Sequence, residues 1–409
     1  MLTVQNNNII IGTNRNMKVQ NTVSKVIEIC LRIFGIWPNI SCVLLRRMFW
    51  IFTLVIEQAL QYRYIVKHFY LIEFSEMMRI IGSTMAYTIF LIKLIIFWYK
   101  QRTFNKILMM MTIDWEKCSR TNFSMFTTTT NVKLSQRFTN MTVILYSTSI
   151  IFYSTFIILF SYNVFEKAAD DGITFNVSTQ LLILDMDLPF DVNRRFVYES
   201  VMIVQFFYLL LSANAVGLLN AFLITVILHI SGQIDILRKS LIEIFPKEKK
   251  LIPSHFMINK IIKKHQKIIT FSQHIEDLYS YIAMVLFVSD TLVICCLGFT
   301  IVASIGRPDA FNSIIKNTLF YFIMNSEAFV FCFAGEYLST KSKSIGDAAY
   351  DSFWYELDSK DSRNILLLIL RSQNQLTITI GKIMNLSLEQ FSNIIKTSAS
   401  YISILLAMY

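Results

Sequence analysis

The chain has 409 residues, of which 54% are apolar and only 16% charged, and its mean hydropathy is +0.49. A soluble domain of this length does not need so much apolar material, whereas a membrane-spanning helix needs about 20 mostly apolar residues. The net charge of +10 does not indicate a nucleic-acid partner, because lysines and arginines collect in the cytoplasmic loops of membrane proteins. The composition therefore predicts an all-α, multi-pass membrane protein.

Seven long apolar windows, none of which contains proline, predict seven transmembrane helices. In chain order they are about 48–66, 77–98, 138–162, 197–228, 279–303, 314–335 and 386–409. We accordingly divide the chain into an N-terminal segment 1–47, helices 1–4 over 48–228 with a loop at 163–196, a connection 229–278, helices 5–6 over 279–335, a connection 336–385 and a final helix over 386–409. The first 30 residues lack the pattern of a secretory signal, so we expect the N-terminus not to be exported.

The distribution of basic residues predicts the orientation of the chain. Of the 38 lysines and arginines, 28 fall in the alternate segments 1–47, 99–137, 229–278 and 336–385, and only five fall in the other three connections. The loop 163–196 is long yet acidic, so loop length alone does not explain the difference. The positive-inside rule then places the N-terminus in the cytoplasm and the C-terminus outside. A G-protein-coupled receptor has the opposite orientation, and its characteristic prolines, loop cysteine and acidic-Arg-aromatic triplet are absent, so a metabotropic receptor is disfavoured.

The connection 229–278 repeats isoleucines at helical spacing, with Lys260, Lys263, Lys264 and Lys267 between them. This pattern fits either an amphipathic helix at the membrane surface or an extension of helices 4 and 5 that packs against neighbouring subunits. We favour the extension, because no glycine or proline break separates the pattern from the flanking spans. The connection 336–385 holds an apolar run at 364–373 that is too short to cross a bilayer, and Gly381 then predicts a segmented last helix.

Residues 333–409 resemble the C-terminal part of insect odorant receptors. The resemblance rests on the order and spacing of six short motifs, namely Ala334-Gly335-Glu336, Ala349-Tyr350-x-Ser352-x-Trp354-Tyr355, Arg371-Ser372-Gln373, Gly381-Lys382, Ser387-Leu388-Glu389-x-Phe391 and Lys396-Thr397-Ser398-x-Ser400-Tyr401. Weaker support comes from Gly35-Ile36-Trp37-Pro38 and Asp187-Leu188-Pro189-Phe190-Asp191.

The resemblance implies a subunit of an odorant-gated, nonselective cation channel in the plasma membrane of olfactory sensory neuron dendrites. Receptors of this family form heterotetramers with a shared odorant co-receptor, and the last span of each subunit lines a central pore. The implied partners are thus the co-receptor, a volatile odorant, permeant cations and membrane lipid. The connection 229–278 is too short for the long insertion of the co-receptor itself, so a tuning receptor is expected. A gustatory-receptor-like homotetrameric channel is the alternative, but the Thr-Tyr-x-x-x-x-x-Gln-Phe ending typical of that class is absent.

Two sets of candidate site residues follow. Thr397, Tyr401, Ile404 and Met408 share one face of a helix, with Ser400 and Ser403 at its edge; the resemblance assigns the gate to Ile404 and Met408. A helix face that only packs against neighbouring helices would contain the same residue types, so packing is the alternative to a pore.

For the odorant pocket we expect an apolar, aromatic cavity. Its candidates are Tyr87, Leu91, Tyr146, Ser149, Tyr153, Phe206, Leu210 and Phe322, each of which would serve equally as bundle core.

Several intramembrane charges are unusual enough to mark function. Asp290 and Glu327 could pair with Lys93 or Arg79 across the bundle or border an ion path, and of these we favour pairing. We expect Lys396 to extend its ammonium group toward the membrane surface. Asn176 begins a glycosylation acceptor in the predicted outer loop.

The six cysteines and five histidines show no metal-ligand or redox spacing, and no phosphate-binding glycine loop is present, so neither a cofactor nor an enzyme activity is expected.

Overall fold

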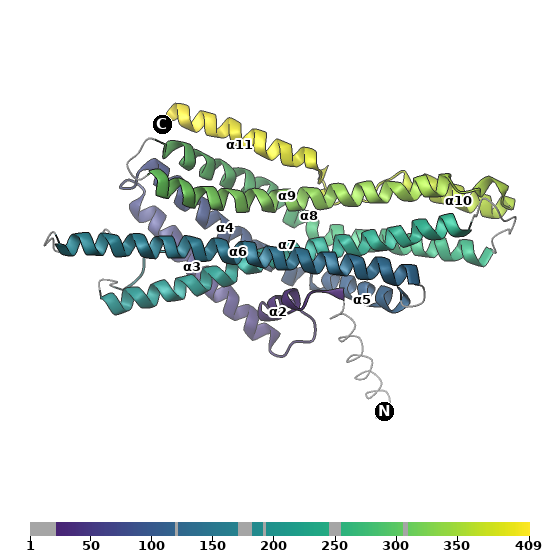
Figure 1. Cartoon of the computed structure of the whole chain (residues 1–409), viewed down its shortest axis with the longest axis horizontal. Helices are drawn as coiled ribbons and strands as arrows, with labels where there is room; N and C mark the ends of the chain where they lie inside the picture. The colour runs from purple at the N-terminus through teal and green to yellow at the C-terminus, as the bar shows by residue number, and fades with distance from the viewer. Residues whose placement is uncertain (1–21, 119–121, 171–181, 191–193, 245–254, 306–309) are drawn as a thin grey trace, which may run out of the picture.

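The computed structural model describes residues 22–118, 122–170, 182–190, 194–244, 255–305 and 310–409, and these parts are almost entirely helical (Figure 1). In chain order the helices are α2 (Lys25–Ile33), α3 (Val43–His68), α4 (Phe74–Tyr99), α5 (Gln101–Cys118), α6 (Asn122–Asp170), α7 (Arg195–Ile244), α8 (His255–Ala303), α9 (Ala310–Tyr350), η2 (Trp354–Glu356), α10 (Ser359–Ser372) and α11 (Leu388–Met408). A two-residue antiparallel hairpin, β1 (Thr379–Ile380) and β2 (Met384–Asn385), precedes α11.

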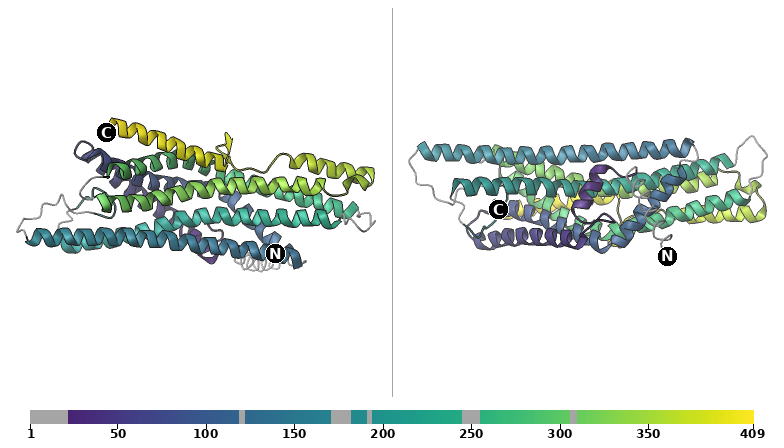
Figure 2. Two further views of the ribbon diagram at one scale, coloured as in Figure 1. Left: turned by 45° about the horizontal axis from the view of Figure 1, so that its top comes forward. Right: turned by 90° about the horizontal axis from the view of Figure 1, so that it is seen from below.

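Five of the described helices are long and apolar enough to cross a membrane, namely α4, α6, α7, α8 and α9. They contain five of the seven predicted spans, α3 contains the first, and α11 makes up most of the last. The long helices α6, α7, α8 and α9 run along a common long axis, with α10 at one end of the bundle and the C-terminus at the other (Figures 1 and 2). The structure is therefore that of a multi-pass membrane protein.

The helices are longer than the predicted spans on the side of α10. α7 continues to Ile244 and α8 begins at His255, so the isoleucine pattern in the connection 229–278 belongs to extensions of the two flanking helices. α9 likewise continues to Tyr350. α5 occupies much of the segment 99–137, which showed no long apolar window. Its buried side chains, such as Phe104, Ile107 and Met111, recur at helical spacing.

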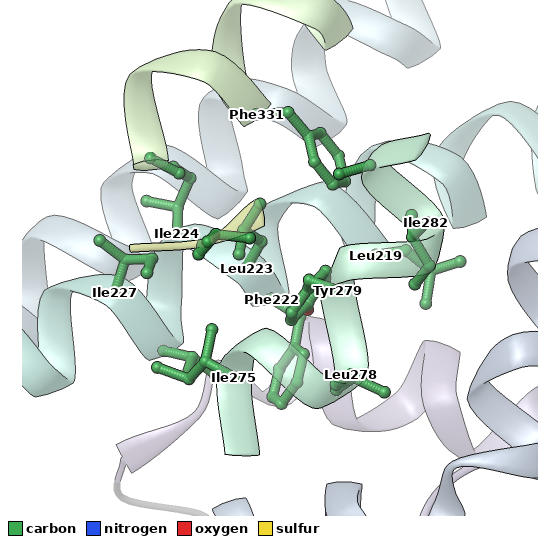
Figure 3. Close-up of a cluster of buried hydrophobic side chains, with 14 of the residues drawn as sticks. Leu219, Phe222, Leu223, Ile224, Ile227, Ile275, Leu278, Tyr279, Ile282 and Phe331 are labelled. Carbon is green, nitrogen blue, oxygen red and sulfur yellow. The ribbon is translucent and has the colours of Figure 1, made fainter. Parts of the chain in front are cut away.

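The core lies where α7, α8 and α9 pack together (Figure 3). Leu219, Phe222 and Leu223 of α7 face Tyr279 of α8, whose ring lies 6.2 Å from that of Phe331 on α9. These side chains are almost fully buried. Lipid is as apolar as they are, so close packing and dispersion, rather than escape from water, hold such helices together.

Two glycines explain how the segmented end of the chain is fixed. Gly381 lies in the hairpin with a left-handed φ of +59°, which favours glycine, and its N–H donates to the carbonyl of Ser280 on α8 (3.0 Å). Gly335 lets α9 approach the chain before α11 closely, since an added Cβ would lie 2.3 Å from the carbonyl oxygen of Leu386. The break predicted at Gly381 is thus a hairpin between α10 and α11.

The cysteines are all free, and five of them are buried, where a thiol packs as a small apolar side chain. Cys42 is the exception, because it is exposed and takes a left-handed conformation (φ 55°) just before α3. Burial raises the pKa of Cys30 to about 12, so this thiol of α2 stays protonated at neutral pH.

Candidate functional site

Helices α4, α6, α7 and α9 enclose a cavity of about 170 Å³. Its wall is formed mainly by apolar side chains: Ile89, Phe90, Ile150, Leu184, Leu209, Val216, Leu319, Phe320, Ile323 and Met324. Small residues, Ala86 on α4 and Ala213 on α7, leave the space open. A cavity of this kind, apolar with a few polar groups, suits a small and largely apolar ligand.

Four of the eight residues predicted for the pocket line this cavity: Tyr87, Tyr146, Ser149 and Tyr153. The other four lie outside its lining. Leu91 packs against the main core, and Phe206 packs in a second cluster that includes Ile157 and Tyr198. Leu210 is half-buried, and Phe322 is 66% exposed on the outer side of α9.

The segment 182–190 closes one side of the cavity. Leu184 contributes to the lining, and Tyr153 donates a hydrogen bond to the carbonyl of Ile183 (3.3 Å). Asp187 ties the same segment to α3 through ion pairs with Arg63 (2.8 Å) and Lys67 (3.2 Å). The hydrogen bond from Lys67 lowers the pKa of the Asp187 carboxyl, with further lowering from Arg63. This gives the Asp187 motif a structural role. Asn176 lies outside the described residues.

A buried ion pair lies beside the cavity. Glu327 of α9, which lines it, pairs with Lys93 of α4, and both side chains are almost inaccessible to solvent. Asn220 of α7 donates to the same carboxylate (3.2 Å) and accepts a hydrogen bond from Lys93 (3.2 Å). The predicted pairing of Glu327 is confirmed, and it joins three helices at one point.

The predicted pairing of Asp290 is wrong. Asp290 of α8 is 0% exposed, and neither carboxylate oxygen has a hydrogen-bond partner among the described residues. Both candidate cations are engaged elsewhere, because Lys93 binds Glu327 and Arg79 binds two other carboxylates, Glu76 (2.7 Å) and Asp185 (2.8 Å). Arg79 also lines the cavity, as does Lys316 of α9.

α11 lies along one edge of the bundle, against α8 and α9 (Figure 2). Ile394 and Ser398 face inward, and the Ser398 hydroxyl donates to the carbonyl of Thr291 on α8 (3.0 Å). The residues predicted to line a pore are all exposed: Thr397, Ser400, Tyr401, Ile404 and Met408, with Ile404 55% and Met408 82% exposed. Lys396 is exposed beside them. The chain by itself thus leaves the whole predicted face uncovered.

Sequence reasoning missed Lys316 as a cavity residue, together with Ser83, Leu184, Ser212 and Ala213. For Lys316 a signal existed, because a lysine within an apolar span is a functional candidate by default. The small residues gave no comparable signal, since serine and alanine are common in packed membrane helices.

The fold and cavity define a class, a multi-pass helical membrane protein with an apolar cavity between its helices. A family model described as "7tm Odorant receptor" matches residues 73–399. The chain belongs to this family of odorant receptors, and it is a receptor rather than an enzyme.

Individual relatives agree with this membership. Odorant receptor 10 of Aedes albopictus is 31% identical over 150 residues, which are 37% of this chain and 39% of that protein. Odorant receptor 22c of Drosophila melanogaster is 23% identical over 236 residues, which are 54% of this chain and 57% of that protein. These alignments therefore span about half, or less, of the relatives' own length. The solved structure of the insect olfactory receptor OR5 from Machilis hrabei, in complex with eugenol, has the same fold, with a TM-score of 0.73 at 15% identity over 94% of this chain and 97% of that one.

Proposed function

We propose that this chain is the odorant-binding subunit of a nonselective cation channel that it forms with the odorant co-receptor. The observation that carries the proposal is the apolar cavity between α4, α6, α7 and α9 in a chain of the odorant receptor family. The neighbour of known structure was solved with eugenol, a small aromatic odorant, and a ligand of that kind suits a cavity with this lining.

The exposed face of α11 supports assembly into a channel. Ile404 and Met408 project from the bundle with no cover from the rest of the described chain, and Thr397 and Ser400 continue the same face. Four such faces around one axis would give hydroxyls along the pore and an apolar constriction that closes by dewetting. In this arrangement the chain crosses the plasma membrane seven times, with its N-terminus in the cytoplasm and its C-terminus outside.

The proposed mechanism is a shift between two populations. An odorant that binds the open arrangement more tightly than the closed one favours the open state by the difference in its two binding free energies. The cavity and α11 are joined through α8 and α9, since α9 supplies cavity residues and α11 packs on both helices. We propose that a small change in the packing of these two helices separates the constrictions of the four subunits.

Expression in oocytes with and without the co-receptor tests the proposal. Odorant-evoked cation currents are expected only when both chains are present. Currents from this chain alone would overturn the obligate partnership and favour a homotetrameric channel. An epitope tag after Tyr409 should be accessible on intact cells, and a cytoplasmic tag would refute the orientation.

A further inference from the structure

Most polar side chains that line the cavity already have partners within the protein. Ser83, Ser149 and Ser212 donate to the carbonyls of Ile80 (2.9 Å), Leu145 (2.8 Å) and Tyr208 (2.8 Å) in the preceding turns of their own helices. Arg79 and Glu327 are held in the ion pairs described above. These groups are therefore poorly available to a ligand.

The ammonium group of Lys316 is different. No ion pair or hydrogen bond joins it to another described residue, and its Nζ lies 5.7 Å from the centroid of the Phe156 ring. Lys316 lies near the end of the span 314–335, and an ammonium group that faces an apolar cavity without an acceptor is unfavourable. It has three N–H donors to offer to an oxygen atom in the cavity.

The Tyr87 hydroxyl is a second donor that the protein leaves available. The residue is 8% exposed and lines the cavity, and the hydroxyl nearest its Oη, that of Ser212, donates to the carbonyl of Tyr208 instead of accepting a well-formed hydrogen bond from Tyr87. The Tyr87 ring stacks on Tyr208 at 6.1 Å. A buried hydroxyl that is not hydrogen-bonded costs free energy, which an acceptor on a ligand would recover.

The charges around Lys316 argue for a neutral ligand. Arg79 and Lys316 supply two positive charges near the cavity, and Glu76 and Asp185, both paired with Arg79, supply two negative ones. A carboxylate ligand would add an unbalanced charge, and an amine would bring a second ammonium group toward Lys316. A carbonyl oxygen accepts hydrogen bonds without adding charge.

We infer that this cavity selects neutral carbonyl compounds, that is ketones, aldehydes or esters with an apolar body, by offering the Lys316 ammonium and the Tyr87 hydroxyl as donors. This inference rests on the proposed odorant-binding function. The distance from Lys316 to Glu327 along α9 is about 16 Å at 1.5 Å per residue, which leaves room for a hydrocarbon chain beyond the carbonyl group.

The test is binding of three probes of equal carbon number, 2-hexanone, hexane and hexylamine, to the full-length chain purified in detergent. Apparent affinities come from ligand-dependent shifts of the melting temperature. The native chain should bind 2-hexanone roughly tenfold or more tightly than the other two probes, the advantage expected for a hydrogen bond to a charged donor. Lys316→Met should remove this preference and leave the affinity for hexane unchanged.

Two further variants keep the test decisive. Tyr87→Phe deletes a single oxygen atom, so it should fold normally and reduce the same preference severalfold. Lys133→Met makes the same change at an exposed lysine of α6 away from the cavity, and should behave as the native chain. Equal binding of the three probes, or a preference that survives both cavity variants, would overturn the inference. Binding needs no current, so selective binding without odorant-evoked current would refute the channel proposal alone.

Discussion

At the scale of single residues, the contact between Lys93 and Glu327 links the cavity to the core of the bundle. Both side chains are buried, and Asn220 bonds to each of them. A buried ion pair adds little stability compared with apolar residues of the same size. Loss of one partner, however, leaves the other charge in an apolar medium without a counter-charge. The pair therefore constrains how α4, α7 and α9 can pack.

Lys93→Met is expected to lower the free energy of unfolding by about 3–5 kcal/mol, because Glu327 loses its counter-charge. The double variant Lys93→Met with Glu327→Leu should regain most of that loss. Melting temperatures of the purified protein in detergent measure both effects. If the double variant is as unstable as the single one, the charge of Glu327 is not the cause.

The residue scale also shows what a single sequence can reveal of the site. Charges inside apolar spans are visible in the sequence, and Lys93, Arg79 and Glu327 all lie at or beside the cavity. Of the aromatic and aliphatic candidates, three tyrosines line the cavity, whereas Leu91, Phe206, Leu210 and Phe322 do not. Whether Tyr87 or Leu91 of α4 faces the cavity depends on the rotation of each helix against its neighbours, which one sequence does not specify.

At the scale of elements, α11 is the helix on which gating depends in the proposed mechanism. Its apolar constriction should exclude water in the closed state only while Ile404 remains apolar. We expect Ile404→Asn, in oocytes that also express the co-receptor, to raise the basal current severalfold in the absence of odorant. Leu406→Asn places the same side chain on the opposite side of the helix and should leave the basal current low. Equal basal currents from both variants would contradict the assignment of the pore face.

The junction of α5, α7 and α8 is a second element-scale feature, and it predicts a pH dependence. Asp114 of α5 pairs with Lys267 of α8 and lies 3.4 Å from Nε2 of His229 on α7. Burial opposes ionisation of Asp114, but His229 and Lys267 outweigh it and hold the pKa of this carboxyl below its usual value. The pairing therefore stabilises the fold above the pKa of the unfolded state, about 3.9, and is lost as the pH falls below it.

Asp114→Asn should therefore lower the free energy of unfolding by about 2 kcal/mol at pH 7, since it removes a largely buried ionic partner. The difference in the free energy of unfolding between this variant and the native chain should shrink as the pH falls through 4. Melting temperatures of both proteins between pH 7 and about pH 2.5, a range that extends below the pKa of the unfolded state, measure this effect. A difference that stays constant over that range would show that ionisation of Asp114 is not involved.

At the scale of the whole molecule, the sequence predicted the long helices well because bilayer thickness imposes long apolar windows. It predicted their ends poorly. Beyond the spans, α6, α7, α8 and α9 carry more polar residues, and their continuation depends on packing against each other. α5 was missed because its 18 residues contain no long apolar window, although its buried side chains recur at helical spacing. The hairpin between α10 and α11 could be placed only approximately, at Gly381.

The central claim is that an odorant in the cavity between α4, α6, α7 and α9 opens the channel. Ala213 of α7 lines that cavity, and Ala213→Phe would fill much of it with an aromatic ring. The decisive measurement is the odorant-evoked current of this variant in oocytes that also express the co-receptor, normalised to its amount at the cell surface. Our account predicts that the current is lost while surface expression is retained. An undiminished current with unchanged odorant sensitivity would contradict it.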